Sequence, residues 1–260
     1  MAVAVMLSIT IYAMHAGNFV LLDSTPVLYT NAEILISGAH FDEWRTAALS
    51  IKTGPLGRTL SLLTFTAENV IRGGFNAAWM KITNAVIHVL TGGAIWLFLV
   101  KVLSHSPLLR LSREQVSTLA CLATALWLLH PLHASTVLYT VQRMTQLAAL
   151  FTMLGLWHTF RLRVEWLERA PGPEDYSRLA LLGLIWTLLA AYSKENGLLL
   201  PFFFAVTELA LFRFRIAGGE SVLMRWGVLG SLGVLLAGLV VFPLLRPDVI
   251  AEWYSVRDFT

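Results

Sequence analysis

Seven apolar segments divide this chain, and they constrain its fold more than any other feature of the sequence. They cover roughly 2–16, 76–100, 115–129, 134–160, 178–192, 197–213 and 222–245. An α-helix that crosses a bilayer needs about 20 predominantly apolar residues, and a backbone in lipid must satisfy its own hydrogen bonds. The sequence therefore predicts an all-α polytopic membrane protein with about seven transmembrane helices, forming a single transmembrane domain over residues 1–260.

The composition agrees with a membrane protein. Hydrophobic residues make up 57% and charged residues 13% of the chain, whereas soluble domains carry about 25% charged residues. The net charge of +3 does not indicate a nucleic-acid partner, because basic residues of membrane proteins concentrate in cytoplasmic loops. The single cysteine, Cys121, excludes an internal disulfide.

Lysine and arginine predict the orientation. They gather in the loops that follow the second, fourth and sixth apolar segments, at Lys101, Arg110, Arg113, Arg161, Arg163, Arg169, Arg178, Arg213, Arg215 and Arg225. Alternate loops share one face if every segment crosses the membrane, and the basic face is cytoplasmic. The N-terminus is then cytoplasmic, and the polar segment 17–74 lies outside.

Within that external segment, "RTLSLLTFTAENVIRG" (58–73) places apolar residues at helical spacing. This pattern predicts an amphipathic helix that lies in the interface. A cation near a helix N-terminus opposes the helix dipole, so Arg58 is expected to contact a ligand or a lipid headgroup instead.

An external acid follows the first apolar segment. Asp23 in "GNFVLLDSTPVLYTN" is expected to be partly desolvated, which raises a carboxyl pKa and suits a general base. The alternative is a solvated loop acid or a helix cap.

Two histidines surround a proline in "LLHPLHASTVLYTVQRMTQLAAL" (128–150). Pro131 ends the preceding helix at or before His130, so His130 and His133 are expected at the external turn. They fit hydrogen bonds to a phosphate, capping of the broken backbone, or a metal site. A metal would want a third ligand, and none is predicted.

Two further cations are expected near the same face. Arg143 follows Gln142, about ten residues into the fourth segment, and must face the bundle or water. Its guanidinium suits phosphate, or an internal salt bridge, for example to Glu195. Lys194 lies in the short turn "AYSKENGLLLP" (191–201), where it is expected to contact a phosphate or to lie at the lipid headgroups.

Glu195 is expected to orient one of these cations. His88 belongs to a polar stripe with Lys81 and Asn84 on the second apolar segment. Residues at this spacing share one helix face, and interhelical hydrogen bonding is the favoured role of the stripe.

The order of these motifs resembles the membrane part of GT-C glycosyltransferases, and is most similar to bacterial relatives of the transmembrane and TPR-repeat O-mannosyltransferases. The motifs are the acid after the first segment, "GRTLSLLTF", "NAVIHVL", "LLHPLHASTVLYTVQRM", "YSKENGLLLP" and a final "RDFT". The likeness extends over about 18–260. Paired acids are frequent in that family, whereas Leu22 precedes Asp23 here.

The resemblance implies a sugar donor linked to polyprenyl phosphate, a protein or glycan acceptor, and transfer at the external face, in the periplasm if the membrane is a bacterial inner membrane. Asp23 would be the base. Phosphate-side candidates are Arg58, His130, His133, Arg143 and Lys194, supported by Glu195, Gln142 and His88. No cofactor or metal is predicted; membrane lipids are expected partners, and later spans and TPR repeats are expected to be missing from this chain.

Two other functions compete with the transferase. One is a non-catalytic binder or transporter of polyprenyl phosphate, which would need a polar path through the bilayer. The other is a membrane anchor for a TPR interaction domain.

Overall fold

Helices make up nearly all of the regular structure in the computed structural model, which describes residues 1–17, 24–38, 40–50, 56–105, 110–245 and 247–248. The one sheet in these residues is an antiparallel hairpin of β1 (Arg215–Ile216) and β2 (Gly219–Glu220). The prediction of an all-α protein is therefore confirmed.

Each of the seven apolar segments is helical. The main helices are α1 (Ala2–Met14), α4 (Ala77–His105), α5 (Arg113–Leu128), α7 (Arg143–Glu168), α8 (Pro173–Ser193), α9 (Leu200–Thr207) and α10 (Val222–Leu245). Shorter elements are η1 (Thr25–Tyr29), η2 (Ala32–Ile34), α2 (Phe41–Ala48), α3 (Thr59–Arg72), α6 (His133–Leu138), η3 (Thr140–Gln142), η4 (Glu195–Leu199) and η5 (Glu208–Phe212).

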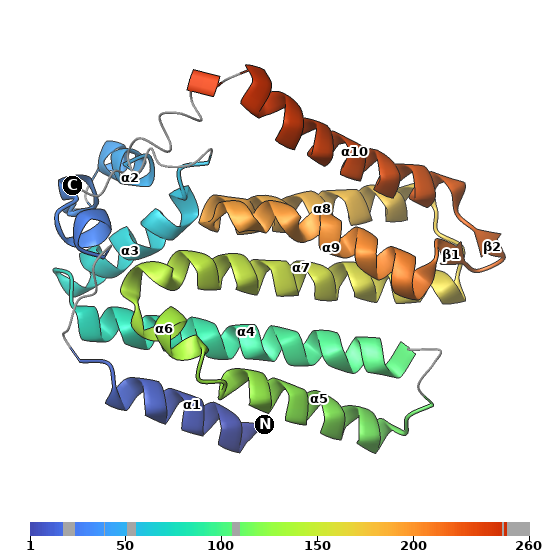
Figure 1. Ribbon diagram of the computed structural model, residues 1–260, viewed down its shortest axis with the longest axis horizontal. Helices are drawn as coiled ribbons and strands as arrows, with labels where there is room; N and C mark the ends of the chain where they lie inside the picture. The colour runs from blue at the N-terminus through green and yellow to red at the C-terminus, as the bar shows by residue number, and fades with distance from the viewer. Residues whose placement is uncertain (18–23, 39, 51–55, 106–109, 246, 249–260) are drawn as a thin grey trace.

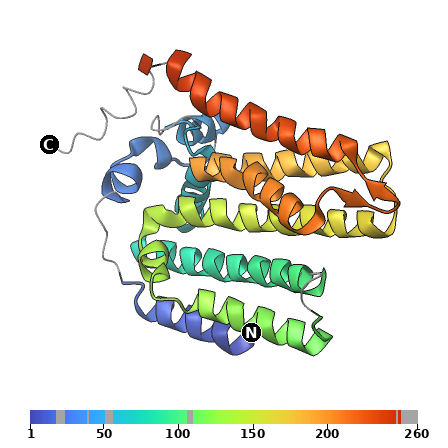
Figure 2. The same cartoon turned by 45° about the vertical axis from the view of Figure 1, so that its right-hand side comes forward.

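The long helices form an elongated bundle with α4 and α7 side by side at its centre (Figures 1 and 2). Helices α1 and α5 pack beyond α4, while α8 and α9 pack beyond α7 and α10 lies outermost. The predicted interfacial segment forms α3, which lies with α2 across the left-hand end in Figure 1. We call this the α3 end and the opposite one the hairpin end.

The basic connections gather at the hairpin end. The C-terminal end of α4, the N-terminal end of α5 and the connections from α7 to α8 and from η5 to α10 all lie there in Figure 1. The turn before α6 and the turn after α8 lie toward the α3 end. This arrangement places the basic loops at one end of the bundle; that this end is the cytoplasmic face stays a prediction.

Three helical stretches among the described residues are long and apolar enough to cross a membrane. They are Ala77–His105, Pro173–Ser193 and the run Glu195–Phe212, which joins η4, α9 and η5. The apolar helices Ala2–Met14 and Val222–Gly238 are shorter. Helix α7 is long but more polar, because it occupies the centre of the bundle and buries Arg143, Gln146 and Arg163.

The fourth predicted segment is broken rather than continuous. Helix α6 ends at Leu138, Tyr139 is extended (φ −94°, ψ 106°), and α7 begins at Arg143. The expectation that Arg143 lies well inside a helix is therefore wrong. The Asn84 side chain supports the break, since its Nδ2 atom donates to the carbonyls of Val137, Tyr139 and Thr140 at 3.2, 3.3 and 3.2 Å.

A buried ion pair stabilises the hairpin end. The Nε and Nη2 atoms of Arg163 donate to the two carboxylate oxygens of Glu208 at 2.8 and 2.9 Å, and both side chains are fully buried. Arg163 also donates to the Arg215 carbonyl at 3.0 Å, and Glu208 accepts from the Phe214 N–H at 3.0 Å. The pair therefore ties α7 to the chain on both sides of the turn that leads into the hairpin.

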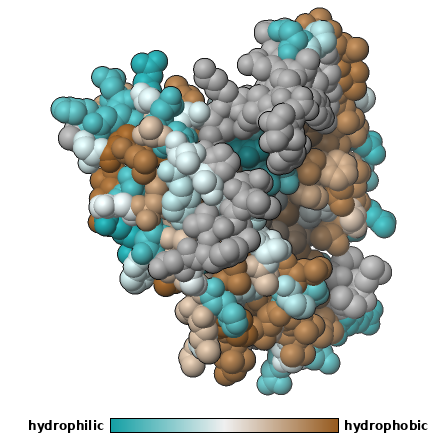
Figure 3. All heavy atoms as spheres, turned by 60° about the vertical axis from the view of Figure 1, so that its left-hand side comes forward, coloured by the Kyte–Doolittle hydropathy of each residue, from teal (hydrophilic) through white to brown (hydrophobic). Residues whose placement is uncertain are grey.

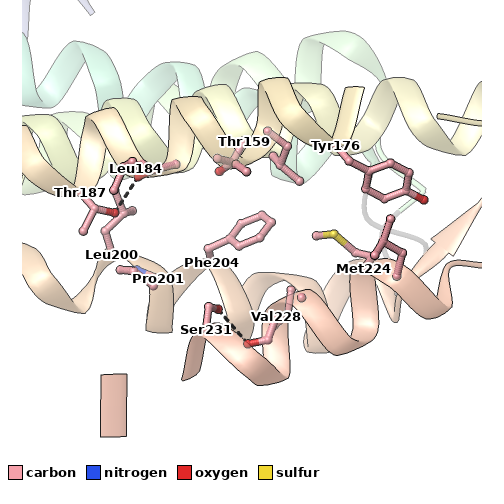
Figure 4. A pocket seen from close by; sticks show the side chains of 15 residues that line it. Thr159, Tyr176, Leu184, Thr187, Leu200, Pro201, Phe204, Met224, Val228 and Ser231 are labelled. Carbon is pink, nitrogen blue, oxygen red and sulfur yellow. Dashed lines mark hydrogen bonds between the residues drawn. The ribbon is translucent and has the colours of Figure 1, made fainter. Parts of the chain in front are cut away.

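An apolar cavity of about 460 Å³ separates α8 from α9 and α10. Figure 4 shows Phe204 pointing into it, with Thr159 and Tyr176 on one side and Val228 and Ser231 on the other. Its lining is almost entirely apolar.

Candidate functional site

Four of the predicted site residues meet at the α3 end, where α8 ends and α3 and α7 begin. Lys194 Nζ donates to Thr145 Oγ1 at 2.7 Å, and Thr145 donates to Gln142 Oε1 at 2.6 Å. Beside them, Arg58 Nε donates to Glu195 Oε1 at 3.2 Å. We call Arg58 and Lys194 the cation pair. Both are partly exposed, so each can reach a ligand.

The position of Arg58 is costly for the backbone. Its φ of 54° and ψ of 31° are left-handed, a conformation that costs about 1–2 kcal/mol for a residue other than glycine. Its charge also lies at the unfavourable end of α3. The ion pair with Glu195 and the contact of Nη1 with Met144 Sδ at 3.8 Å offset part of this cost. Glu195 therefore holds Arg58, whereas Arg143 has another partner.

An apolar groove of about 420 Å³ begins beside the cation pair. Its walls come from α3 and α8, and its lining residues are Thr59, Leu60, Leu63, Ile185, Leu188, Leu189 and Tyr192. Thr59 directly follows Arg58, and Tyr192 precedes Lys194 by two residues. The two cations do not line the groove themselves, but each is a near sequence neighbour of a residue that does. Figure 3 turns the left-hand end of Figure 1 forward and shows hydrophilic and hydrophobic residues mixed on the visible surface.

Arg143 is fully buried beneath this surface. Its Nε donates to Asn84 Oδ1 at 3.0 Å, and its Nη2 donates to Glu68 Oε2 at 2.5 Å and to the Met80 carbonyl at 3.2 Å. Its Nη1 reaches the Thr64 carbonyl at 3.4 Å. These contacts join α3, α4 and α7, so Arg143 positions the start of α7, which carries Thr145.

Sequence reasoning missed Glu68, the ion-pair partner of Arg143. The signal was available, because Ser61, Phe65 and Glu68 recur at helical spacing and all three are buried in α3. A carboxylate on an otherwise apolar helix face requires a partner. Thr145, which links Lys194 to Gln142, was also missed, and its sequence context carried no distinctive signal.

The histidines form a second group around Trp127. The His133 ring lies 4.6 Å from Trp127, 5.1 Å from His88 and 6.1 Å from His130, measured between ring centroids. His88 Nε2 also bonds the Leu128 carbonyl at 3.0 Å, and the Leu132 N–H donates to His130 Nδ1 at 3.3 Å. The contact of His130 is of the kind that the backbone-capping alternative requires, whereas the contacts given for His133 are with neighbouring rings.

Burial lowers the pKa of His133, and the neighbouring His130 lowers it further. A histidine with a pKa below about 6.5 is largely neutral at pH 7. It can donate one hydrogen bond to a phosphate but brings no full charge. Among the described residues, no three His, Cys, Asp or Glu side chains are arranged to hold a metal ion.

The predicted stripe on α4 serves interhelical hydrogen bonding, as expected. Lys81 Nζ donates to the Gly17 carbonyl at 2.7 Å, Asn84 binds the break after α6, and His88 holds the end of α5. Lys81, Asn84 and His88 thus hold three different segments of the chain against α4.

Asp23, the predicted base, lies outside the described residues. The first described residue after it, Ser24, accepts a hydrogen bond from Thr140 Oγ1 at 2.6 Å, and both side chains are buried. The described contacts divide the remaining candidates into three groups: the cation pair with Glu195 and Gln142, the buried Arg143, and the histidines. No protein family, curated protein or solved structure matches this chain.

Proposed function

We propose that this chain is an integral membrane protein that transfers a sugar from a polyprenyl-phosphate-linked donor to a protein or glycan acceptor. Its seven apolar segments would all cross the membrane in a GT-C-like arrangement, with the hairpin end cytoplasmic and the α3 end external. The observation that carries the proposal is the apolar groove between α3 and α8, whose lining residues Thr59 and Tyr192 are near sequence neighbours of the cation pair. Apolar surface and cations so placed match a ligand with a long apolar chain and an anionic head.

The chemistry requires charge stabilisation at the phosphate. When an acceptor hydroxyl attacks the anomeric carbon, the bond from that carbon to the phosphate oxygen breaks, and the polyprenyl phosphate leaves with the bonding electrons. Arg58 and Lys194 beside this oxygen would stabilise the charge that develops in the transition state. Glu195 and the Thr145 hydroxyl hold the two cations in place.

The acceptor must lose a proton in the same step. Under this proposal Asp23 receives it, since a base is needed on the side of the anomeric carbon opposite the leaving phosphate. Arg143 supports the site indirectly, by fixing the first turn of α7. A phosphate contact from His133 would use its single N–H.

A binding and transfer experiment tests the proposal in two steps. Full-length protein in detergent is titrated with a polyprenyl phosphate, and binding is followed by native mass spectrometry. Loss of one charge-assisted hydrogen bond costs about 1.5–3 kcal/mol, so Arg58→Gln and Lys194→Gln are each expected to weaken binding about tenfold or more. Arg45→Gln, an exposed arginine of α2 at the same end, is the matched control.

Transfer is then measured in membranes with radiolabelled polyprenyl-phosphate sugars as donors. Asp23→Asn is expected to bind the lipid normally and to lose transfer. Lipid binding that is unaffected by both cation variants contradicts the proposed site. Flux of the labelled lipid across proteoliposomes, with no sugar transferred to any acceptor, assigns the chain to transport instead.

A further inference from the structure

A hollow between α3 and α4 combines charged groups with apolar walls, and it lies apart from the cation pair. Its volume is about 380 Å³. Glu68, Arg72 and Arg143 contribute its charges, while Ile71, Thr83 and Ile87 line other parts. Arg58 and Arg72 mark the two ends of α3. They are separated by 14 residues, or about 20 Å at 1.5 Å per residue.

The charges in the hollow do not cancel. One carboxylate serves two guanidinium groups: Glu68 Oε2 binds the buried Arg143, and its Oε1 lies 3.4 Å from Arg72 Nε. The Thr83 hydroxyl also donates to Oε1, at 3.1 Å. The lining therefore carries one net positive charge, and an anion entering the hollow is attracted to it.

Arg72 is the group that such an anion meets. Its side chain is 37% exposed, and its guanidinium carbon lies 4.2 Å from the centroid of the Trp79 ring. Trp79 belongs to the first turn of α4, which is one of the stretches able to cross a membrane. Tryptophan and arginine at such a helix end occupy the level of lipid headgroups.

The apolar walls extend inward from that level. Ile87 lies eight residues beyond Trp79 on α4, or about 12 Å deeper along the helix axis. Ile71 is 82% exposed beside the mouth. A bound molecule thus meets a cation at the mouth of the hollow and apolar side chains deeper in. A membrane lipid with an anionic headgroup has the matching arrangement of charge and acyl chain.

We infer that the hollow between α3 and α4 binds an anionic phospholipid, with its phosphate on Arg72 and one acyl chain along Ile71 and Ile87. Glu68 and Arg143 line the hollow beside Arg72, and Glu68 holds Arg72 in position. The bound lipid ties α3 to the membrane surface at the end opposite Arg58. This inference does not depend on the transferase proposal.

Lipid-specific fluorescence quenching tests the inference. The full-length protein is reconstituted in phosphatidylcholine vesicles with a small, equal fraction of brominated phosphatidylglycerol or brominated phosphatidylcholine. The signal of Trp79 is obtained as the difference between the wild type and Trp79→Phe. Brominated phosphatidylglycerol is expected to quench this signal more strongly, because the anionic lipid is enriched in the hollow.

Variants of Arg72 locate the cause of that preference. One basic residue near a negative membrane surface is worth about a fivefold change in lipid affinity. In Arg72→Gln, the preference for phosphatidylglycerol over phosphatidylcholine is expected to fall about fivefold. Arg72→Lys is expected to keep part of the preference, and Arg45→Gln is expected to leave it unchanged. Equal quenching by the two brominated lipids in the wild type, or a preference that survives Arg72→Gln, overturns the inference.

The source of the phosphate is tested in the same samples. Inorganic phosphate is added, with chloride at matched ionic strength as the reference. A preference for phosphatidylglycerol that persists supports a lipid ligand. A preference that phosphate abolishes but chloride does not identifies a free-anion site and overturns the lipid assignment.

Discussion

The ion pair between Arg143 and Glu68 joins α7 to α3 across 75 residues of sequence, and the two side chains are 0% and 9% exposed. It connects the centre of the bundle to the helix that covers its end. The cation pair and the proposed lipid hollow both depend on where this contact holds α3.

Breaking this ion pair is expected to destabilise the protein severely. Arg143→Met leaves the Glu68 carboxylate buried without its main partner, and such changes cost about 3–5 kcal/mol. The double variant Arg143→Met/Glu68→Met is expected to regain much of the loss, because both charges are removed. Loss of helical circular dichroism on heating in detergent measures the effect. A single-variant loss below about 1 kcal/mol would show that the pair is not a buried one.

The break between α6 and α7 is expected to depend on Asn84. Asn84→Leu preserves the size of the side chain but removes its hydrogen bonds to three carbonyls and to Arg143 Nε. The Tyr139 and Thr140 carbonyls keep the backbone N–H groups of Gln142 and Arg143, whereas Arg143 Nε loses its acceptor. Each buried unsatisfied group costs about 1–3 kcal/mol. Hydrogen–deuterium exchange is expected to rise in residues 133–143 and to stay unchanged in α8. Equal exchange in the variant and the wild type would rule out this role.

Acidification is expected to weaken the histidine turn through His133. Burial lowers the pKa of His133 in the folded protein, so the unfolded chain binds more protons below the unfolded value of about 6.5. Stability is therefore full above that pH and falls as the pH drops toward the folded pKa. Comparing the unfolding midpoints of the wild type and His133→Asn between about pH 7.5 and about pH 5 isolates this residue. Parallel profiles would contradict the assignment.

The protonation of His133 also predicts how the binding of a phosphate ligand depends on pH. An anion bound to His133 stabilises its charged form and raises its pKa. Binding is then accompanied by proton uptake and strengthens as the pH falls toward 6. Calorimetric titration with polyprenyl phosphate in two buffers of different ionisation enthalpy measures this uptake. His133→Asn removes it if the contact is made, and an unchanged uptake in this variant assigns the proton to another group.

Gly→Ala substitutions are expected to change stability in opposite directions at the apolar cavity and at close packing contacts. A Cβ atom at Gly183 or Gly227 meets no atom within 4 Å, and both glycines line the apolar cavity. Alanine at either site is expected to stabilise the helix by about 1 kcal/mol.

Alanine at two other glycines is expected to have the opposite effect. At Gly197 the added Cβ would lie 2.1 Å from the Ala190 carbonyl carbon, and at Gly155 it would lie 2.7 Å from Leu200 Cδ2. Overpacking of this kind costs about 1–3 kcal/mol. Thermal unfolding of the four single variants under one detergent condition checks the order. A destabilising Gly183→Ala would show that the cavity is filled in solution.

Hydropathy predicted the helical segments well, because burial in a membrane or a bundle interior acts on each segment independently. It did not predict the interruption at Tyr139, which depends on Asn84 more than 50 residues away in the chain. The partner of Arg143 was missed for a similar reason. Glu195 appeared the nearer carboxylate, but it binds Arg58, and the packing of α3 presents Glu68 instead.

Short elements at the two ends also escaped prediction. Helix α2 has only eight residues, three of them charged, and the β1–β2 hairpin relies on Gly218 and Gly219 at φ of 89° and 150°. Among the candidate residues, the sequence indicated Arg58, Lys194 and Glu195 by their unusual charges in short turns. Their grouping became visible only when α3 was placed against α8.

The side-chain amide of Asn84 serves two neighbours at once. Its nitrogen holds the chain between α6 and α7, and its oxygen accepts from Arg143. Because the amide is planar and rigid, a tilt that follows movement of α6 also changes the contact with the arginine. One side chain thus fixes both the turn between α6 and α7 and the orientation of the buried arginine, so neither can shift alone without loss of an Asn84 hydrogen bond.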